Sequence, residues 1–201
     1  MFGSNPYAQA GWYNPQNPFS INAGPWQPGS SNPPTFGALP SQSNSKSVLT
    51  FEFSSFHPDI FNCMVTGPKQ RKFFEVKTAN NNTVISKPEG PFAIIHWAQR
   101  PTVEASGVIA FQRTGEYLKL APDRSHRTVT VSGRNYAWVP GQNGIGLYTN
   151  GSNPPQQLAR LSITNDHSKV ILEITSEAFQ AGLFEPCIVS TILLFCARNI
   201  D

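Results

Sequence analysis

The feature that most limits the fold of this chain is an almost uninterrupted apolar run of eleven residues near its C-terminus, 187–197. A Glu-Pro pair before the run suits a helix start, and an Arg after it suits a helix end. As a helix the run would span about 16 Å, roughly half the hydrocarbon thickness of a bilayer, so no transmembrane span is expected. We therefore predict a helix over about 186–198 that is buried on every side. Its β-branched residues leave a buried strand as the alternative.

The chain from residue 48 to residue 175 consists of short β-type runs separated by turn residues. Several runs alternate with period two, which is typical of a strand with one buried and one wet face. No run is long enough for a crossover helix, so a parallel nucleotide-binding sheet is not expected. We predict strands over residues 48–53, 62–66, 72–78, 83–86, 92–98, 107–112, 116–121, 128–132, 135–139, 144–149, 158–164 and 169–175.

These two features predict one all-β domain over residues 47–201. About twelve short antiparallel strands would form a closed or nearly closed barrel around the C-terminal apolar helix, because closure removes the exposed edges of an open sheet. The residues expected in the structural core are Trp97, Tyr117, Tyr136, Trp138, Ile188, Ile192, Leu193 and Phe195.

Residues 1–46 differ from the rest in composition. The first 45 residues contain no Asp, Glu, Lys, Arg or His, and single aromatics stand between spacers rich in Pro, Asn, Gln, Gly and Ser. Such a segment cannot bury enough apolar area to offset its chain entropy, so a disordered N-terminal tail is predicted. It is either a solvated linker or a segment whose aromatics make weak multivalent contacts with a protein partner.

The basic residues are scattered and the net charge is only +3, so no nucleic acid is expected as a partner. Two clusters stand out within this pattern. Each is either a solvated turn or a contact for an anionic ligand such as a phosphoinositide head group. The candidate contacts are Lys69, Arg71 and Lys72 in the first cluster, and Arg124 and Arg127 in the second.

The cysteines and histidines form no recognisable catalytic or metal-binding pattern. Cys63, Cys187 and Cys196 lack a ligand spacing and are expected to be buried thiols, and the N-terminus has no secretory signal pattern. Both points favour a reducing, intracellular and cytoplasmic location. The four histidines lie far apart, and no nucleophile motif is present. We therefore expect neither a cofactor, nor a metal, nor enzymatic activity.

Two tryptophans allow a structural and a functional interpretation. Trp97 and Trp138 are each expected in the core, with the indole N–H satisfied by a neighbour. If both rings were exposed on one face, they could instead stack on a sugar or a base.

Several of these segments carry a family resemblance. The stretch Ile94-Ile95-His96-Trp97, the pair Tyr117-Leu118, the stretch Gly133-Arg134-Asn135-Tyr136-Ala137-Trp138 and the closing apolar run resemble a fungal family of domains of unknown function. In that family an I-x-W strand precedes a Y-x-W strand. The strands with a terminal apolar helix also resemble the tubby C-terminal-like fold of tubby, scramblase-type and LURP-one-related proteins. That resemblance implies a lipid-binding, membrane-associated or transcription-linked module, although the binding pocket of the tubby proteins does not align here and no binding residue is carried over.

The sequence thus predicts a non-catalytic binding or scaffold module. An anionic-membrane-surface module that binds phosphoinositides and a carbohydrate-binding β-domain are the alternatives. The ligand itself is not specified by any motif.

Overall fold

The computed structural model describes residues 47–56, 59–152 and 154–201. The chain separates into two units, residues 1–45 and 46–201, and the description concerns the second. The predicted disorder and multivalent contacts of residues 1–46 lie outside the described residues and stay predictions. The strands are β1 (Val48–Ser54), β2 (Cys63–Thr66), β3 (Lys72–Ala79), β4 (Asn82–Lys87), β5 (Gly90–His96), β6 (Thr102–Ala105), β7 (Ile109–Arg113), β8 (Lys119–Leu120), β9 (Arg127–Val131), β10 (Arg134–Gly141), β11 (Gly144–Thr149), β12 (Gln157–Ile163) and β13 (Val170–Thr175). The helices are η2 (Pro68–Gln70), α1 (Thr114–Tyr117), α2 (Ser176–Gln180) and α3 (Phe184–Phe195).

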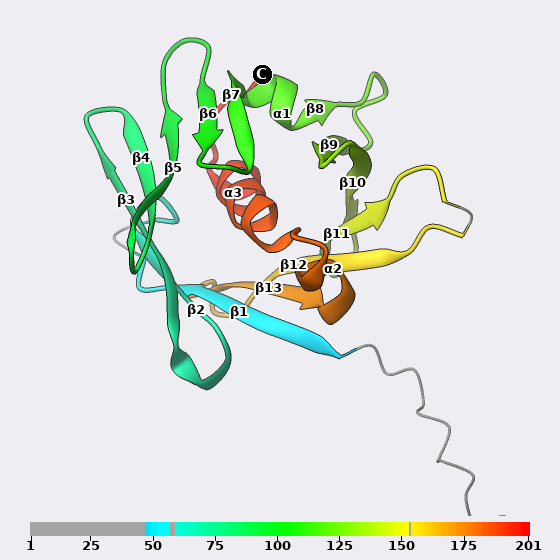
Figure 1. Cartoon of the computed structure of the whole chain (residues 1–201), viewed down its shortest axis with the longest axis horizontal. Helices are drawn as coiled ribbons and strands as arrows, with labels where there is room; N and C mark the ends of the chain where they lie inside the picture. Colours follow the sequence, from blue (N-terminus) through cyan, green and yellow to red (C-terminus); the bar gives the residue numbers. More distant parts are fainter. Residues whose placement is uncertain (1–46, 57–58, 153) are drawn as a thin grey trace, which may run out of the picture. The chain divides into compact units, whose positions relative to one another are not determined.

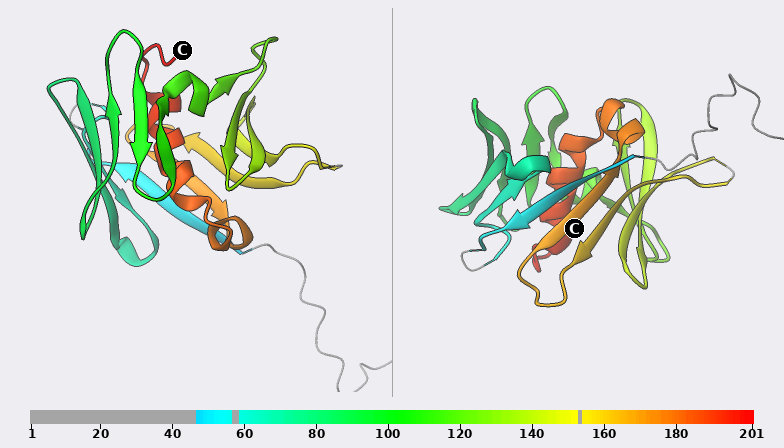
Figure 2. Two further views of the ribbon diagram at one scale, coloured as in Figure 1. Left: turned by 45° about the horizontal axis from the view of Figure 1, so that its top comes forward. Right: turned by 90° about the horizontal axis from the view of Figure 1, so that it is seen from below.

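The strands form one strongly curved antiparallel sheet around α3 (Figures 1 and 2). Its order is β7-β6-β5-β4-β3-β2-β1-β13-β12-β11-β10-β9-β8, so the pairing of β1 with β13 joins the two ends of the domain. Strands β7 and β8 are the two edges, and among the described residues no hydrogen bonds join them. The prediction of a nearly closed barrel is confirmed, and the alternative of a barrel closed by strand pairing is wrong. We call the gap between β7 and β8 the seam.

Helix α3 lies inside the curve of the sheet, and nine of its twelve residues are buried. The helix is confirmed and the strand alternative is wrong. It begins and ends earlier than predicted: the amide of Cys187 already donates to the carbonyl of Leu183, and Ala197 has φ +49°, which ends the helix before Arg198. Inside the core, the Thr191 hydroxyl donates to the Cys187 carbonyl over 2.7 Å. None of the helices in the described residues has the length and hydrophobicity that crossing a membrane requires.

Two local predictions about strands need correction. The sheet has thirteen strands, because the four-residue β6 was not predicted. The predicted strand over 116–121 is wrong for its first half, where α1 ends at Tyr117 and only β8 is extended. Tyr117 and Leu118 are both buried, so these neighbours do not alternate between an inner and an outer face. The Tyr117 hydroxyl donates to the Pro186 carbonyl over 3.0 Å and thereby attaches α1 to α3.

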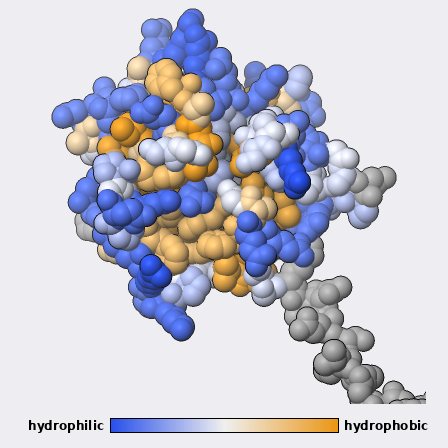
Figure 3. Space-filling model, in the orientation of Figure 1, coloured by the Kyte–Doolittle hydropathy of each residue, from blue (hydrophilic) through white to orange (hydrophobic). Residues whose placement is uncertain are grey.

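The aromatic residues fill the interior between the sheet and α3. Trp97 and Trp138 are 8% and 1% exposed, so they do not form the exposed pair that a stacking platform requires. The Trp97 indole donates to the Thr83 hydroxyl over 2.7 Å, whereas the buried Trp138 indole has no hydrogen-bond partner among the described residues. Tyr136 and the α3 residues Ile188, Ile192 and Leu193 are also buried, and Phe195 is half-buried against the core. In Figure 3, apolar residues gather in the middle of one face and hydrophilic residues surround them.

Candidate functional site

A pocket of about 540 Å³ lies at the seam, where β7 ends and β8 begins. We call it the seam pocket. Three segments distant in sequence form its lining: the residues just before β6, the stretch from the end of β7 through α1 and β8 into the β8–β9 loop, and residues 200 and 201. The lining residues are Arg100, Pro101, Arg113, Gly115, Glu116, Lys119, Leu120, Arg124, Ile200 and Asp201.

Thr114 connects these segments. Its amide donates to the Pro101 carbonyl over 3.0 Å, and its hydroxyl donates to the Ile200 carbonyl over 2.6 Å. Next to it, Gly115 approaches the chain closely: a Cβ there would lie 3.2 Å from the Cα of Asp201. Buried hydrogen bonds of this kind fix the backbone on which the charged side chains of the pocket stand.

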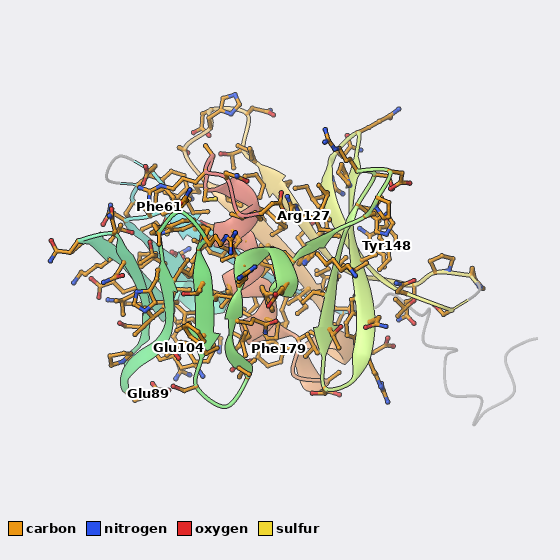
Figure 4. The ribbon with its side chains drawn as sticks, turned by 90° about the horizontal axis from the view of Figure 1, so that it is seen from above. Phe61, Glu89, Glu104, Arg127, Tyr148 and Phe179 are labelled. Atoms are coloured by element: carbon orange, nitrogen blue, oxygen red, sulfur yellow. The ribbon has the colours of Figure 1, made fainter. Side chains whose placement is uncertain are left out.

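Arg127 holds the Asp201 side of the pocket. Its guanidinium donates two parallel hydrogen bonds of 2.8 Å to the two carboxylate oxygens of Asp201, and a third of 2.8 Å to the Leu118 carbonyl. Figure 4 shows α1 between the two halves of the sheet, with Arg127 labelled beside it. The hydrogen bonds from Arg127 hold the pKa of Asp201 below its usual range. Arg127, one of the predicted ligand contacts, is therefore already occupied by a carboxylate of its own chain.

We expect Arg127→Gln to raise the pKa of Asp201 towards the ordinary carboxyl value of about 3.9. Because folding lowers this pKa, the pair stabilises the fold above about pH 3.9, and that contribution is lost as the pH falls through the lower folded pKa. An NMR titration of the Asp201 carboxyl carbon would measure the change. Asp166 is the internal control, since hydrogen bonds from Thr164 and Ser168 lower its pKa to about 2 without Arg127. An unchanged Asp201 titration in the variant would contradict the assignment.

Within the part of the chain that the structure describes, the other cations of the pocket have no such carboxylate partner. Four basic lining residues are exposed, and their side chains form neither an ion pair nor a hydrogen bond with the described residues. They are Arg100, Arg113, Lys119 and Arg124. With Asp201 paired to Arg127, Glu116 is the remaining acidic residue of the lining. The seam pocket therefore carries an excess of positive charge, which favours an anionic ligand.

The first predicted basic cluster lies elsewhere. Its segment connects β2 to β3 at the lower edge of the molecule in Figure 1 and in the left view of Figure 2, whereas the β8–β9 loop lies at the upper right. Lys72 pairs with Glu75 over 2.7 Å, and the Arg71 guanidinium lies 5.5 Å from the centre of the Phe73 ring. Lys69 is exposed. The five predicted contacts therefore do not share one surface, and Arg124 is the one that lines the seam pocket.

The residues Arg100, Arg113 and Lys119 were not among the predicted contacts. Each is a single basic residue between uncharged or acidic neighbours, so no local cluster marks it in the sequence. The two edges of the sheet and the turn through α1 bring them together, and a single sequence does not show that arrangement.

A larger hollow of about 820 Å³ lies over β1, β12 and β13. Two charged side chains line it, and one of them is already bonded, because Arg160 donates to the Asn143 carbonyl over 2.9 Å. Size alone does not define a binding site, which also needs several polar groups that converge on the ligand. We therefore regard the smaller seam pocket as the better candidate.

The three cysteines are buried, and His96 is hydrogen-bonded to a neighbouring strand. Cys63, Cys187 and Cys196 are free and buried, and burial raises the pKa of the Cys63 thiol to about 12 and that of Cys187 further. A thiol of high pKa holds little thiolate, so neither is an activated nucleophile. His96 Nδ1 lies 2.6 Å from Asn82 Oδ1. In the part of the chain that the structure describes, no three His, Cys, Asp or Glu side chains gather as metal ligands would.

Comparison with known proteins gives little beyond this geometry. No family model matches the chain. No curated protein matches it either. The X-ray structure of a protein from Arabidopsis thaliana is similar over 72% of this chain and 90% of that one, with 12% sequence identity and a TM-score of 0.39. At that score the likeness carries no argument about function, and the family resemblance stays a prediction.

Proposed function

We propose that this domain is a non-catalytic binding module that holds an anionic group of its ligand in the seam pocket. The observation that carries the proposal is the convergence on one hollow of four cationic side chains, Arg100, Arg113, Lys119 and Arg124, that form no ion pair or hydrogen bond with the described residues. Cations left unpaired beside a concave surface attract and orient an anion, and arginine is well suited to carboxylate and phosphate groups.

The state of two buried thiols and of His96 supports binding rather than catalysis. The buried thiols have raised pKa values, and His96 is bonded to Asn82 on the neighbouring strand. Buried free cysteines also suit a reducing compartment, so we further propose an intracellular location.

Inorganic pyrophosphate is a suitable first probe because it carries negative charge and has no apolar group, so it tests the anionic contact alone. We expect it to shift the NMR amide signals of Thr114 and Gly115 in the full chain, and to bind more weakly as salt is added. The double variant Arg113→Gln/Arg124→Gln should weaken binding about tenfold, since each exposed pair contributes up to about 1 kcal/mol. Arg134→Gln is the matched control, because Arg134 is exposed, lies outside the pocket and forms no ion pair with the described residues. Equal losses in both variants would contradict the pocket assignment.

A lipid surface is a second source of the same anionic chemistry. Co-sedimentation with phosphatidylcholine vesicles, with and without a phosphoinositide, separates it from a soluble ligand. Binding that the pocket double variant abolishes would assign the anion to a lipid head group. Binding that is instead lost in Lys69→Gln/Arg71→Gln would move the site to the β2–β3 connection and overturn the proposal.

A further inference from the structure

The two edges of the sheet differ in length and protection. Strand β8 has two residues, too few to template another strand, whereas β7 has five. Among the described residues β7 pairs only with β6, so its outer edge has no strand partner. Proteins usually protect such an edge with proline, charged side chains, a bulge or a cover, because unpaired backbone groups recruit other strands. Strand β7 contains neither proline nor lysine, and its protection consists of a bulge against β6 and of Arg113 at its end.

An exposed aromatic ring stands on this edge. Phe111 is 65% exposed, more than any other large hydrophobic side chain among the described residues. Ile109, two positions earlier, is 6% exposed, although residues two apart on a regular strand share one face. The register between β6 and β7 shifts here, and such a bulge redirects a side chain. The bulge thus accounts for the outward position of Phe111, which leaves an apolar contact available beside the open edge.

The edge leads directly into the seam pocket. Arg113, the last residue of β7, lines the pocket and is paired with Thr102 on β6. Arg100, which also lines the pocket, lies two residues before Thr102. A strand added to β7 would therefore have one end beside the cations of the pocket. Carboxylates at that end would meet these cations, whereas a second copy of β7 would bring arginine and no acid. Charge complementarity therefore favours an acidic partner over self-association.

We propose that β7 accepts an extended acidic segment of a partner protein as an additional strand, with carboxylates of that segment in the seam pocket and an apolar side chain against Phe111. In strand addition, main-chain hydrogen bonds supply affinity and side-chain contacts supply specificity. This inference rests on the proposed function, because it assigns the anionic group of the ligand to Asp or Glu side chains.

The probe is a fluorescent, acetylated and amidated peptide Val-Glu-Val-Glu-Val-Glu, titrated with the full-length protein by fluorescence anisotropy. Two matched peptides separate the contributions: one carries N-methyl groups on all of its backbone amides, and the other has Lys in place of Glu. We expect either change to weaken binding about tenfold or more, because the first removes main-chain donors and the second reverses the charge. Phe111→Ala and Arg113→Gln should each weaken binding of the acidic peptide severalfold. The controls Ile163→Ala and Arg134→Gln should leave its affinity unchanged.

The outcomes separate this inference from the proposed function. Equal binding of the N-methylated peptide would overturn strand addition and leave the anionic pocket standing. Pyrophosphate or vesicle binding at the pocket without peptide binding would do the same. A dimer in light scattering that Phe111→Ala dissociates would assign the edge to a second copy and overturn the proposal. Failure of pyrophosphate, vesicles and peptide alike would overturn the proposed function as well.

Discussion

Replacing Ile192 with aspartate is expected to leave no folded protein. Ile192 is 0% exposed and lies on α3 in the interior of the curved sheet. The sheet and the helix surround this position, so an aspartate there would be buried among apolar side chains without a partner. Burial of an unpaired carboxyl group costs several kcal/mol, against a total stability of about 5–15 kcal/mol for a domain. The loss is large because α3 is the element around which both halves of the sheet pack.

Circular dichroism and chemical denaturation would measure the outcome. Ile192→Val should cost only about 1 kcal/mol, because it removes one methylene group and introduces no charge. Ile163→Asp introduces the same carboxylate at a side chain that is 46% exposed on β12, and should leave a cooperative unfolding transition. A soluble Ile192→Asp protein with cooperative unfolding would mean that α3 does not hold the fold together.

Gly144→Ala is the second substitution with a large expected effect. Gly144 begins β11 with φ +119°, and a Cβ at this position would lie 1.9 Å from the carbonyl oxygen of Leu161. That oxygen belongs to the backbone of the adjacent strand β12, which β13 fixes on its other side, so it cannot move aside as a flexible side chain would. Backbone strain and overpacking together should cost about 3 kcal/mol or more.

Gly133→Ala is the matched control for conformational strain without a clash. Gly133 has φ +75°, and a Cβ there would have no neighbour within 4 Å. It should therefore cost about 1 kcal/mol, the typical price of a side chain in a left-handed conformation. Urea denaturation midpoints of the two variants would give the comparison. Equal losses would show that the approach of Leu161 to Gly144 has no energetic consequence.

The sequence predicted the fold where the pattern within one segment determines the structure. The alternation of apolar and polar residues between turns located most strands. The apolar run near the C-terminus has no polar face, so it could be stable only inside the sheet, which is where α3 lies. The pattern failed where tertiary contacts decide. Tyr117 is drawn inward by its bond to the Pro186 carbonyl, and β6 is too short to show a period of its own.

The candidate site was much less predictable than the fold. Arg124 was recognised because charged neighbours mark it, but Arg100 and Arg113 are isolated in sequence and converge only through the edge of the sheet. Arg127 looked like a ligand contact, yet its partner is Asp201 at the far end of the domain. An ion pair between residues so distant in sequence leaves no local pattern.

The order of the strands also determines where the chain can be interrupted. Every pair of neighbouring strands is consecutive in sequence except β1 and β13. A break in the backbone within α1 would cut no strand pairing, whereas removal of β1 would separate the half β2–β7 from the half β8–β13. Each half can assemble from local hairpins, but the sheet cannot enclose α3 until the first strand meets the last, and that contact carries the largest loop-closure entropy of the fold. The fold is therefore closed where the first strand pairs with the last. Strands β7 and β8, in the middle of the sequence, are not paired with each other among the described residues.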